Sequence, residues 1–127
     1  MSLDITPMVP AGRQLIHGYG NGGFRIGEEV YSGAVLVLIE STVSWDVAAI
    51  SDISLENLGP VIDEDLGTEI LLIGCGAGAQ PIDRSIRDGL KDAGIVAELM
   101  DTGAACRTFN VLLAEERRVA AALIPVD

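Results

Sequence analysis

Short apolar runs separated by polar or glycine-rich turns dominate this chain and predict the strands of a sheet. The run at residues 34–39 is continuous, as in a strand that is covered on both faces. Residues 69–73 and 95–99 predict a second and a third strand, and the alternation at 43–46 predicts a more peripheral one. A final strand is predicted over 118–124, where helix propensity alone would also allow a helix.

Helix signals fall between these runs. Ser54 is a suitable N-cap for a short helix that Pro60 is expected to break or kink. Asp83 is a suitable N-cap for a second helix, which Gly94 is expected to end. Strand, helix, strand and helix across residues 69–116 are typical of βαβ packing around a largely parallel sheet.

The first part of the chain reads as extended, with two strands flanking the turn at residues 27–29. A glycine at a turn position between apolar runs is a hairpin signature. The pattern therefore predicts a three-layer α/β fold with a central mixed, mostly parallel sheet and an N-terminal β-hairpin region. We expect one domain over residues 1–127, with its core at about 14–124.

The net charge of the chain limits the classes of partner that we expect it to bind. Nineteen acidic residues against eight basic ones give a formal net charge of −11. Such a surface repels phosphate backbones, which excludes nucleic acid as the expected partner. It also counts against adsorption to anionic lipid. A protein partner remains compatible with this charge.

Neither a membrane span nor a secretion signal is expected. No apolar run approaches the roughly 20 residues that span a bilayer. Residues 1–7 lack the basic flank and the apolar stretch of a signal peptide. The two cysteines form neither a disulfide framework nor a paired metal motif. The expected location is the cytoplasm, without direct membrane insertion.

The segment at residues 98–113 carries an unusual density of polar side chains on a predicted helix. The turn at 74–80 follows a buried strand, which is where open α/β sheets place ligands. We interpret the two as one polar corner, either a paired network that ties the helix to loops or a site for a small anion. Its members are Gly74, Cys75, Gly76, Gln80, Asp101, Thr102, Cys106, Arg107, Thr108 and Asn110.

No catalytic residue, cofactor or metal is predicted from these residues. Ala79 stands where a dinucleotide-binding turn has its third glycine. A nucleophilic Cys75 would need a base. The single histidine is His17, and no sequence pattern places it close to a cysteine. Cys106 shares a helical stripe with apolar residues, so packing is its expected role, and a redox pair with Cys75 is the alternative. The acidic run at 63–65 reads as a solvated loop.

Several motifs carry a family resemblance. They are Gly18-Tyr19-Gly20 with Gly22-Gly23-Phe24-Arg25, the strand at 33–38, Trp45, the turn Gly74-x-Gly76-x-x-x-Gln80, and Met100-Asp101-Thr102 through residues 105–112. Together they resemble the family of mitochondrial complex I assembly factor 3 and its small prokaryotic relatives. The resemblance runs from about Ile16 to Leu123, and its last motif is the most specific one.

This resemblance implies a three-layer fold with a central mixed sheet whose last strand runs antiparallel to its neighbours. It also implies a pocket-like region where the turn at 74–80 approaches the helix at 101–113. The family has no established catalytic residues, so none is carried over, and many relatives have threonine at Cys75. Its mitochondrial member acts in assembling a membrane respiratory complex. Prokaryotic relatives tend to be encoded near protein-translocation genes.

Two functions follow as hypotheses. The first is a non-enzymatic interaction or assembly-factor-like domain, linked to the biogenesis of membrane complexes or membrane proteins. It predicts an exposed apolar or self-complementary patch near Trp45 and the N-terminal hairpin, and leaves the oligomeric state open. The alternative is an enzyme or small-anion-binding protein that uses the polar corner. It predicts an open pocket in which Arg107, Asn110 and a thiol or carboxylate converge.

Overall fold

The computed structural model describes residues 13–127, so residues 1–7 and the expectation of no signal peptide lie outside it. The described strands are β1 (Ile16–Gly20), β2 (Gly23–Ile26), β3 (Glu29–Ser32), β4 (Val35–Val37), β5 (Thr42–Ser44), β6 (Ile70–Gly74), β7 (Val96–Met100) and β8 (Val119–Leu123). The described helices are η1 (Ile50–Asp52), α1 (Gly59–Ile62), η2 (Glu64–Leu66), α2 (Arg84–Asp92) and α3 (Thr102–Ala114), of which η1 and η2 are 3₁₀ helices.

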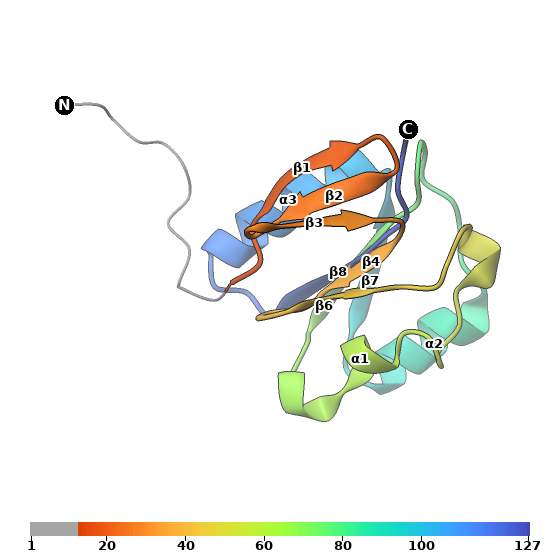
Figure 1. Ribbon diagram of the computed structural model, residues 1–127. Helices are drawn as coiled ribbons and strands as arrows, with labels where there is room; N and C mark the ends of the chain where they lie inside the picture. Colours follow the sequence, from red (N-terminus) through yellow and green to blue (C-terminus); the bar gives the residue numbers. More distant parts are fainter. Residues whose placement is uncertain (1–12) are drawn as a thin grey trace.

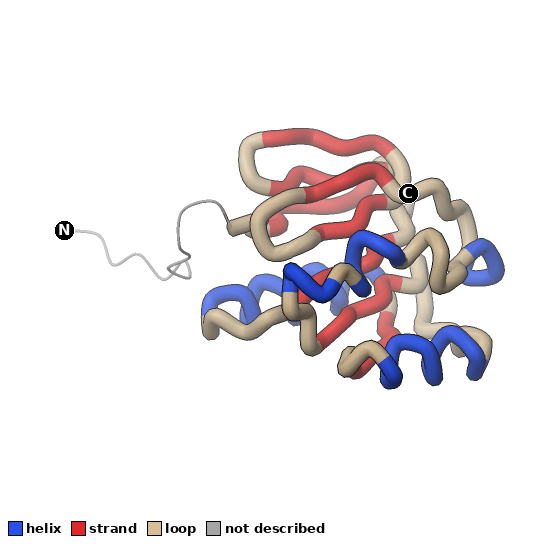
Figure 2. The backbone as a smooth tube through the Cα atoms, turned by 90° about the horizontal axis from the view of Figure 1, so that it is seen from below, coloured by secondary structure: helices blue, strands red, loops and turns tan. Residues whose placement is uncertain are grey.

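The strands form a five-stranded sheet in the order β5-β4-β8-β6-β7 and a three-stranded antiparallel sheet in the order β1-β2-β3. The helices α1 and α2 cover one face of the larger sheet, while α3 and the small sheet cover the other (Figures 1 and 2). The predicted three-layer α/β fold and its N-terminal antiparallel strands are confirmed.

Two details of the predicted sheet are wrong: the last strand was expected to be antiparallel to its neighbours, and the sheet to be mostly parallel. The last strand, β8, is antiparallel to β4 but parallel to β6, and β6 is also parallel to β7. The sheet is therefore half parallel rather than mostly parallel. The connection explains β8, because α3 carries the chain from β7 back to the starting edge of the sheet, as crossover helices do between parallel strands.

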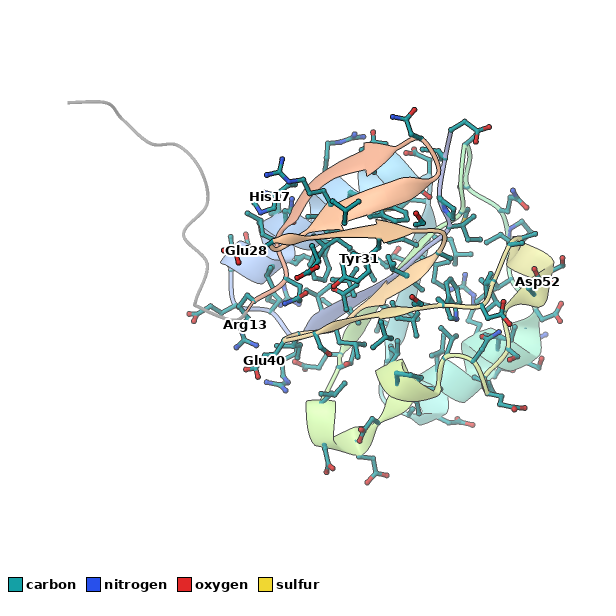
Figure 3. The ribbon with its side chains drawn as sticks, in the orientation of Figure 1. Arg13, His17, Glu28, Tyr31, Glu40 and Asp52 are labelled. Atoms are coloured by element: carbon teal, nitrogen blue, oxygen red, sulfur yellow. The ribbon has the colours of Figure 1, made fainter. Side chains whose placement is uncertain are left out.

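Two apolar clusters hold the layers together, one on each face of the central sheet. Alternate residues of β8 supply both clusters, and the whole strand is buried. Three of its five residues are alanine, because packed layers on both faces leave little room between them. Tyr31 of β3 lies between the two sheets and packs against the cluster on the α3 side (Figure 3).

The small sheet forms where the sequence supplies turn residues of the required handedness. Asn21 and Gly22 connect β1 to β2 with backbone φ angles of 52° and 76°. Asparagine and glycine tolerate this left-handed region, which tight hairpin turns require. The amide of Gly22 also donates to the carbonyl of Val126 at 2.9 Å, so the end of the described chain is tied to this hairpin.

The predicted helix start at Ser54 is wrong. Ser54 and Asn57 instead exchange two hydrogen bonds between side chain and backbone amide, of 3.0 and 3.1 Å, within a turn. The helix α1 begins at Gly59, and Pro60 lies in its first turn, where its missing N–H removes no helical bond. Asp83 occupies the N-cap of α2 without making a side-chain cap, and Gly94 follows the helix with a φ of 80°.

Candidate functional site

Thr102 is the centre of the predicted polar corner. It begins α3 and is fully buried. Its hydroxyl donates to the carbonyl of Ile124 at 2.6 Å and accepts from the amide of Gly76 at 2.9 Å. The amide of Thr102 donates in turn to the carbonyl of Gly76 at 2.9 Å. One side chain thus joins the start of α3, the turn after β6 and the end of β8.

The glycine turn packs directly against this helix start. A Cβ atom at Gly74 would lie 3.0 Å from both Cα and Oγ1 of Thr102 and 2.9 Å from a methyl carbon of Leu123. The amide of Cys75 donates to the carbonyl of Met100 at 2.8 Å. The turn after β6 and the start of α3 are therefore in close contact at the carboxyl ends of β6 and β7, where other α/β sheets hold ligands.

The two cysteines lie on opposite faces of the central sheet. Cys75 belongs to the apolar cluster on the α2 side and Cys106 to the cluster on the α3 side. A redox pair between them is excluded by this placement. Burial raises the pKa of the Cys106 thiol to about 12, against the smaller lowering effect of Arg107. Cys106 is thus a neutral thiol at physiological pH.

Both cysteines are expected to react with iodoacetamide at neutral pH at least about tenfold more slowly than a free thiol. The thiolate is the nucleophile, Cys106 is held protonated, and Cys75 is buried. Peptide-level mass spectrometry after quenching the native protein at successive times measures the rate at each cysteine. The urea-unfolded chain is the control and should react at the free-thiol rate. Faster reaction of native Cys75 than of a free thiol would restore the enzyme hypothesis.

Two further members of the corner have structural partners. Asp101 caps α3, since its Oδ1 accepts from the amide of Ala104 at 2.8 Å. Asn110 accepts from the amide of Ile16 at 2.8 Å and donates to the carbonyl of Ile16 at 2.7 Å. The Asn110 amide thereby pairs with β1 as a neighbouring strand would. Thr108 is half-buried on the same helix and joins none of these bonds.

Arg107 lies apart from the glycine turn, on the side of α3 that faces β1. With Cys106 and Asn110 it lines a hollow of about 240 Å³ that also contacts residues 16–19. A Cβ atom at Gly103 would overlap the hydroxyl oxygen of Tyr19 and lie 3.3 Å from Nη1 of Arg107. The phenol and the guanidinium therefore meet over a glycine of the helix.

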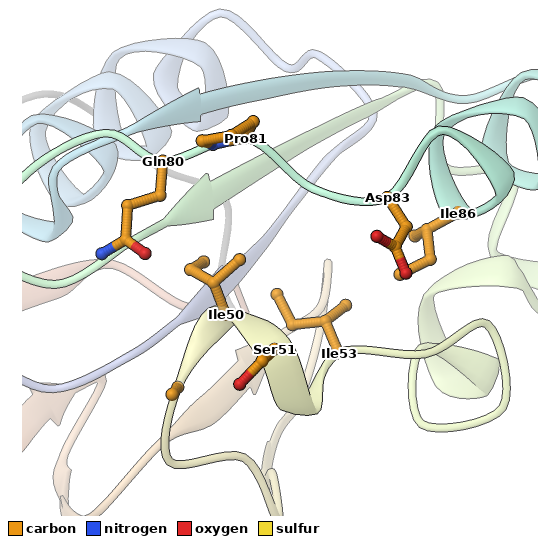
Figure 4. A pocket seen from close by; sticks show the side chains of 8 residues that line it. Ile50, Ser51, Ile53, Gln80, Pro81, Asp83 and Ile86 are labelled. Atoms are coloured by element: carbon orange, nitrogen blue, oxygen red, sulfur yellow. The ribbon is translucent and has the colours of Figure 1, made fainter.

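A larger hollow, of about 400 Å³, lies beside the turn on the α2 side, between η1 and the segment leading into α2 (Figure 4). Ile50, Ile53 and Ile86 supply its apolar wall, and Gln80 and Asp83 line it with polar side chains. The predicted members are thus divided: Gly74, Cys75, Gly76, Asp101 and Thr102 lie together, Gln80 faces this hollow, and Cys106, Arg107 and Asn110 face β1.

The aromatic residues separate into core and surface. Trp45 is only 5% exposed, and its indole N–H donates to the carbonyl of Asn57 at 3.0 Å. The expected patch therefore cannot include Trp45, which belongs to the core. The N-terminal strands do expose apolar side chains, since Tyr19 is 43% exposed and Val30 is 77% exposed. Sequence reasoning missed the approach of Tyr19 to α3, for which Gly103 inside a helix was the available signal.

In the described part of the chain, no helix has the length and apolar character that a membrane span requires. The same residues hold no cluster of three or more side chains suited to a metal ion.

Comparisons with known proteins place this architecture in a family. Residues 16–124 match the family described as "Protein of unknown function (DUF498/DUF598)". NADH dehydrogenase [ubiquinone] 1 alpha subcomplex assembly factor 3 of Danio rerio is 36% identical over 124 residues, which cover 98% of this chain and 71% of that protein. An uncharacterised protein of Rhodobacter capsulatus is 38% identical over 120 residues, covering 91% and 88% of the two chains.

A solved structure agrees with the sequence matches. The crystal structure of a protein from Bartonella henselae, described as an outer membrane protein, superposes with a TM-score of 0.85 at 38% identity and covers 94% of this chain and all of that one. The chain therefore belongs to the DUF498/DUF598 family, the family of complex I assembly factor 3 and its small prokaryotic relatives.

Proposed function

We propose that this chain is an assembly-factor-like, protein-binding domain that acts in the cytoplasm while a membrane-associated complex is built. The observation that carries the proposal is the 36% identity to an NADH dehydrogenase assembly factor across 98% of the chain. The likeness extends over all three layers of the fold and is not confined to one motif. Because the similarity covers the whole domain, we expect this chain to share the protein-binding role of the assembly factor.

The geometry of the polar corner favours a structural role there over a catalytic one. The Thr102 hydroxyl uses its only proton in the bond to Ile124 and accepts a second bond from the amide of Gly76. The two cysteines are separated by the central sheet, and Cys106 is protonated. An enzyme would need groups that converge on a substrate with free hydrogen-bonding capacity. The hydrogen bonds of the corner instead hold α3 against the central sheet.

Two measurements in the source cell test this function. The tagged chain, recovered under mild detergent, is expected to bring with it subunits of a membrane complex, identified by mass spectrometry against an equally acidic tagged control domain. Deletion of the chain is expected to reduce the assembled complex on native gels, with recovery when the wild-type copy returns. An unchanged amount of every membrane complex, together with recovery of the tagged chain alone, would refute the proposal.

A further inference from the structure

Two hollows meet along β1, the edge strand of the small sheet, and share Gly18 and Tyr19. One is the hollow of about 240 Å³ between β1 and α3, and the other, of about 370 Å³, lies over the small sheet. We call the two together the β1 surface. Its members are Ile16, His17, Gly18, Tyr19, Gly20, Asn21, Gly23, Phe24, Arg25, Val30, Tyr31, Ser32, Cys106, Arg107 and Asn110.

The charge of the β1 surface is opposite to that of the chain. The protein has 19 acidic and 8 basic residues, yet no aspartate or glutamate lines either hollow, while Arg25 and Arg107 do. Three other hollows of the described chain each include a carboxylate, for example Asp83, Glu64 and Asp65. The β1 surface therefore offers local positive charge to a negatively charged group.

Both arginines are available for binding. Within residues 13–127 the ion pairs are Arg13 with Glu40 and Arg84 with Asp88, so neither Arg25 nor Arg107 is paired. Arg107 is exposed, and its guanidinium and the Tyr19 hydroxyl lie within 3.3 Å of one point above Gly103. A guanidinium with a nearby hydroxyl suits a carboxylate, which accepts several charge-assisted hydrogen bonds.

His17 also lies at the β1 surface, but we do not assign it a role in binding a carboxylate. His17 and Glu28 lie at the same end of the small sheet in Figure 3, and the backbone of Gly27 bonds there to Leu15. A carboxylate at that end weakens the local positive charge. The two arginines, rather than His17, are therefore the cations that define the ligand.

The β1 surface also offers an exposed apolar side chain and stretches of backbone without side chains. Val30 is 77% exposed, next to Arg25 across the strand pair β2–β3. Cβ atoms at Gly18 and Gly20 would meet no other atom within 4 Å. Glycines without side chains leave the backbone open to close approach by another chain. A ligand with apolar groups beside its carboxylates would therefore contact more of this surface than a free ion.

We infer that the β1 surface binds a short acidic segment of a partner protein, with a carboxylate at Arg107 and Tyr19, a second acidic group near Arg25, and apolar side chains over Val30 and the glycines. This inference rests on the proposed function, because it names the chemistry of the partner. It differs from the predicted anion site at the glycine turn, since the ligand lies on the β1 side of α3.

Peptide titration tests the surface directly. The ¹⁵N-labelled protein is titrated with the peptide Ac-Glu-Val-Glu-Val-Glu-NH₂, with its neutral counterpart Ac-Gln-Val-Gln-Val-Gln-NH₂, and with sodium acetate. The acidic peptide should give saturable shifts at Gly18, Tyr19 and Gly103. The double variant Arg25→Glu/Arg107→Glu should weaken its binding by at least about tenfold, because two attractions become repulsions.

The double variant Arg84→Glu/Lys91→Glu is the matched control, with the same change of net charge on α2, and should bind the acidic peptide as the wild type does. Equal binding of the neutral peptide, or no saturable shift with the acidic one, would overturn the inference. Acetate binding as tightly as the peptide would identify a small-anion site instead. Thermal unfolding of each variant checks that the fold is kept.

Recovery of the tagged chain from cells separates the two proposals. Loss of the recovered partner in the Arg25/Arg107 variant, with retention in the Arg84/Lys91 variant, would support the β1 surface. Retention in both variants would reject this surface and leave the proposed function standing. If the wild type recovers no partner and deletion leaves every membrane complex unchanged, the proposed function fails, and the peptide titration still decides whether the β1 surface binds acidic segments.

Discussion

Replacing Thr102 with valine is expected to lower the free energy of unfolding by about 3 kcal/mol. Valine has nearly the same shape but cannot hydrogen-bond, so it leaves the carbonyl of Ile124 and the amide of Gly76 without their partner. An unpaired buried polar group costs about 1–3 kcal/mol, and this substitution creates two. Urea denaturation followed by the fluorescence of Trp45, the single tryptophan, measures the change.

Thr108→Val is the matched control for this prediction. Thr108 lies on the same helix, is half-buried, and takes no part in the bonds that join the layers. The same chemical change there should alter the free energy of unfolding by less than about 1 kcal/mol, within the range of helix propensities. Equal losses in both variants would show that the Thr102 hydroxyl does not hold the three segments together.

Local patterns predicted most of the elements, because burial on both faces leaves a recognisable apolar run. The runs at 69–73, 95–99 and 118–124 correspond to β6, β7 and β8. The directions of the strands were harder to predict than their positions in the sequence. The crossover through α3 requires β8 to lie parallel to β6, whereas the resemblance had implied antiparallel neighbours on both sides. The general rule that a crossover helix connects parallel strands therefore predicts the direction of β8 better than the family resemblance does.

The structure brings some members of the predicted corner together and separates others, for a reason that lies in the long-range contacts. Gly74, Gly76 and Thr102 meet because the carboxyl ends of β6 and β7 lie at one edge of the sheet. Arg107 and Asn110 turn to β1 instead, since Asn110 bonds to Ile16, 94 residues earlier in the chain. No local pattern shows that the N-terminal strands fold over α3. The one sequence signal of that contact was Gly103 within α3, which leaves room for Tyr19.

Gly74→Ala is expected to lower the free energy of unfolding by about 2 kcal/mol. The added methyl carbon would lie 3.0 Å from the Cα of Thr102 and 2.9 Å from a side-chain carbon of Leu123. Carbon atoms prefer separations of about 3.5–4.0 Å, and overpacking of this kind costs about 1–3 kcal/mol. Leu123 can rotate its methyl group, but the backbone of Thr102 is fixed by its bonds to Gly76.

Gly78→Ala is the control in the same turn. A Cβ atom at Gly78 would meet no other atom within 4 Å, and its backbone lies outside the left-handed region. Alanine there should leave stability unchanged or raise it by up to about 1 kcal/mol, because it restricts the unfolded chain. If Gly74→Ala proves as harmless as Gly78→Ala in urea denaturation, the turn and α3 are not in close contact. The crevice beyond β6 and β7 would then be open to a ligand, and the enzyme hypothesis would regain its pocket.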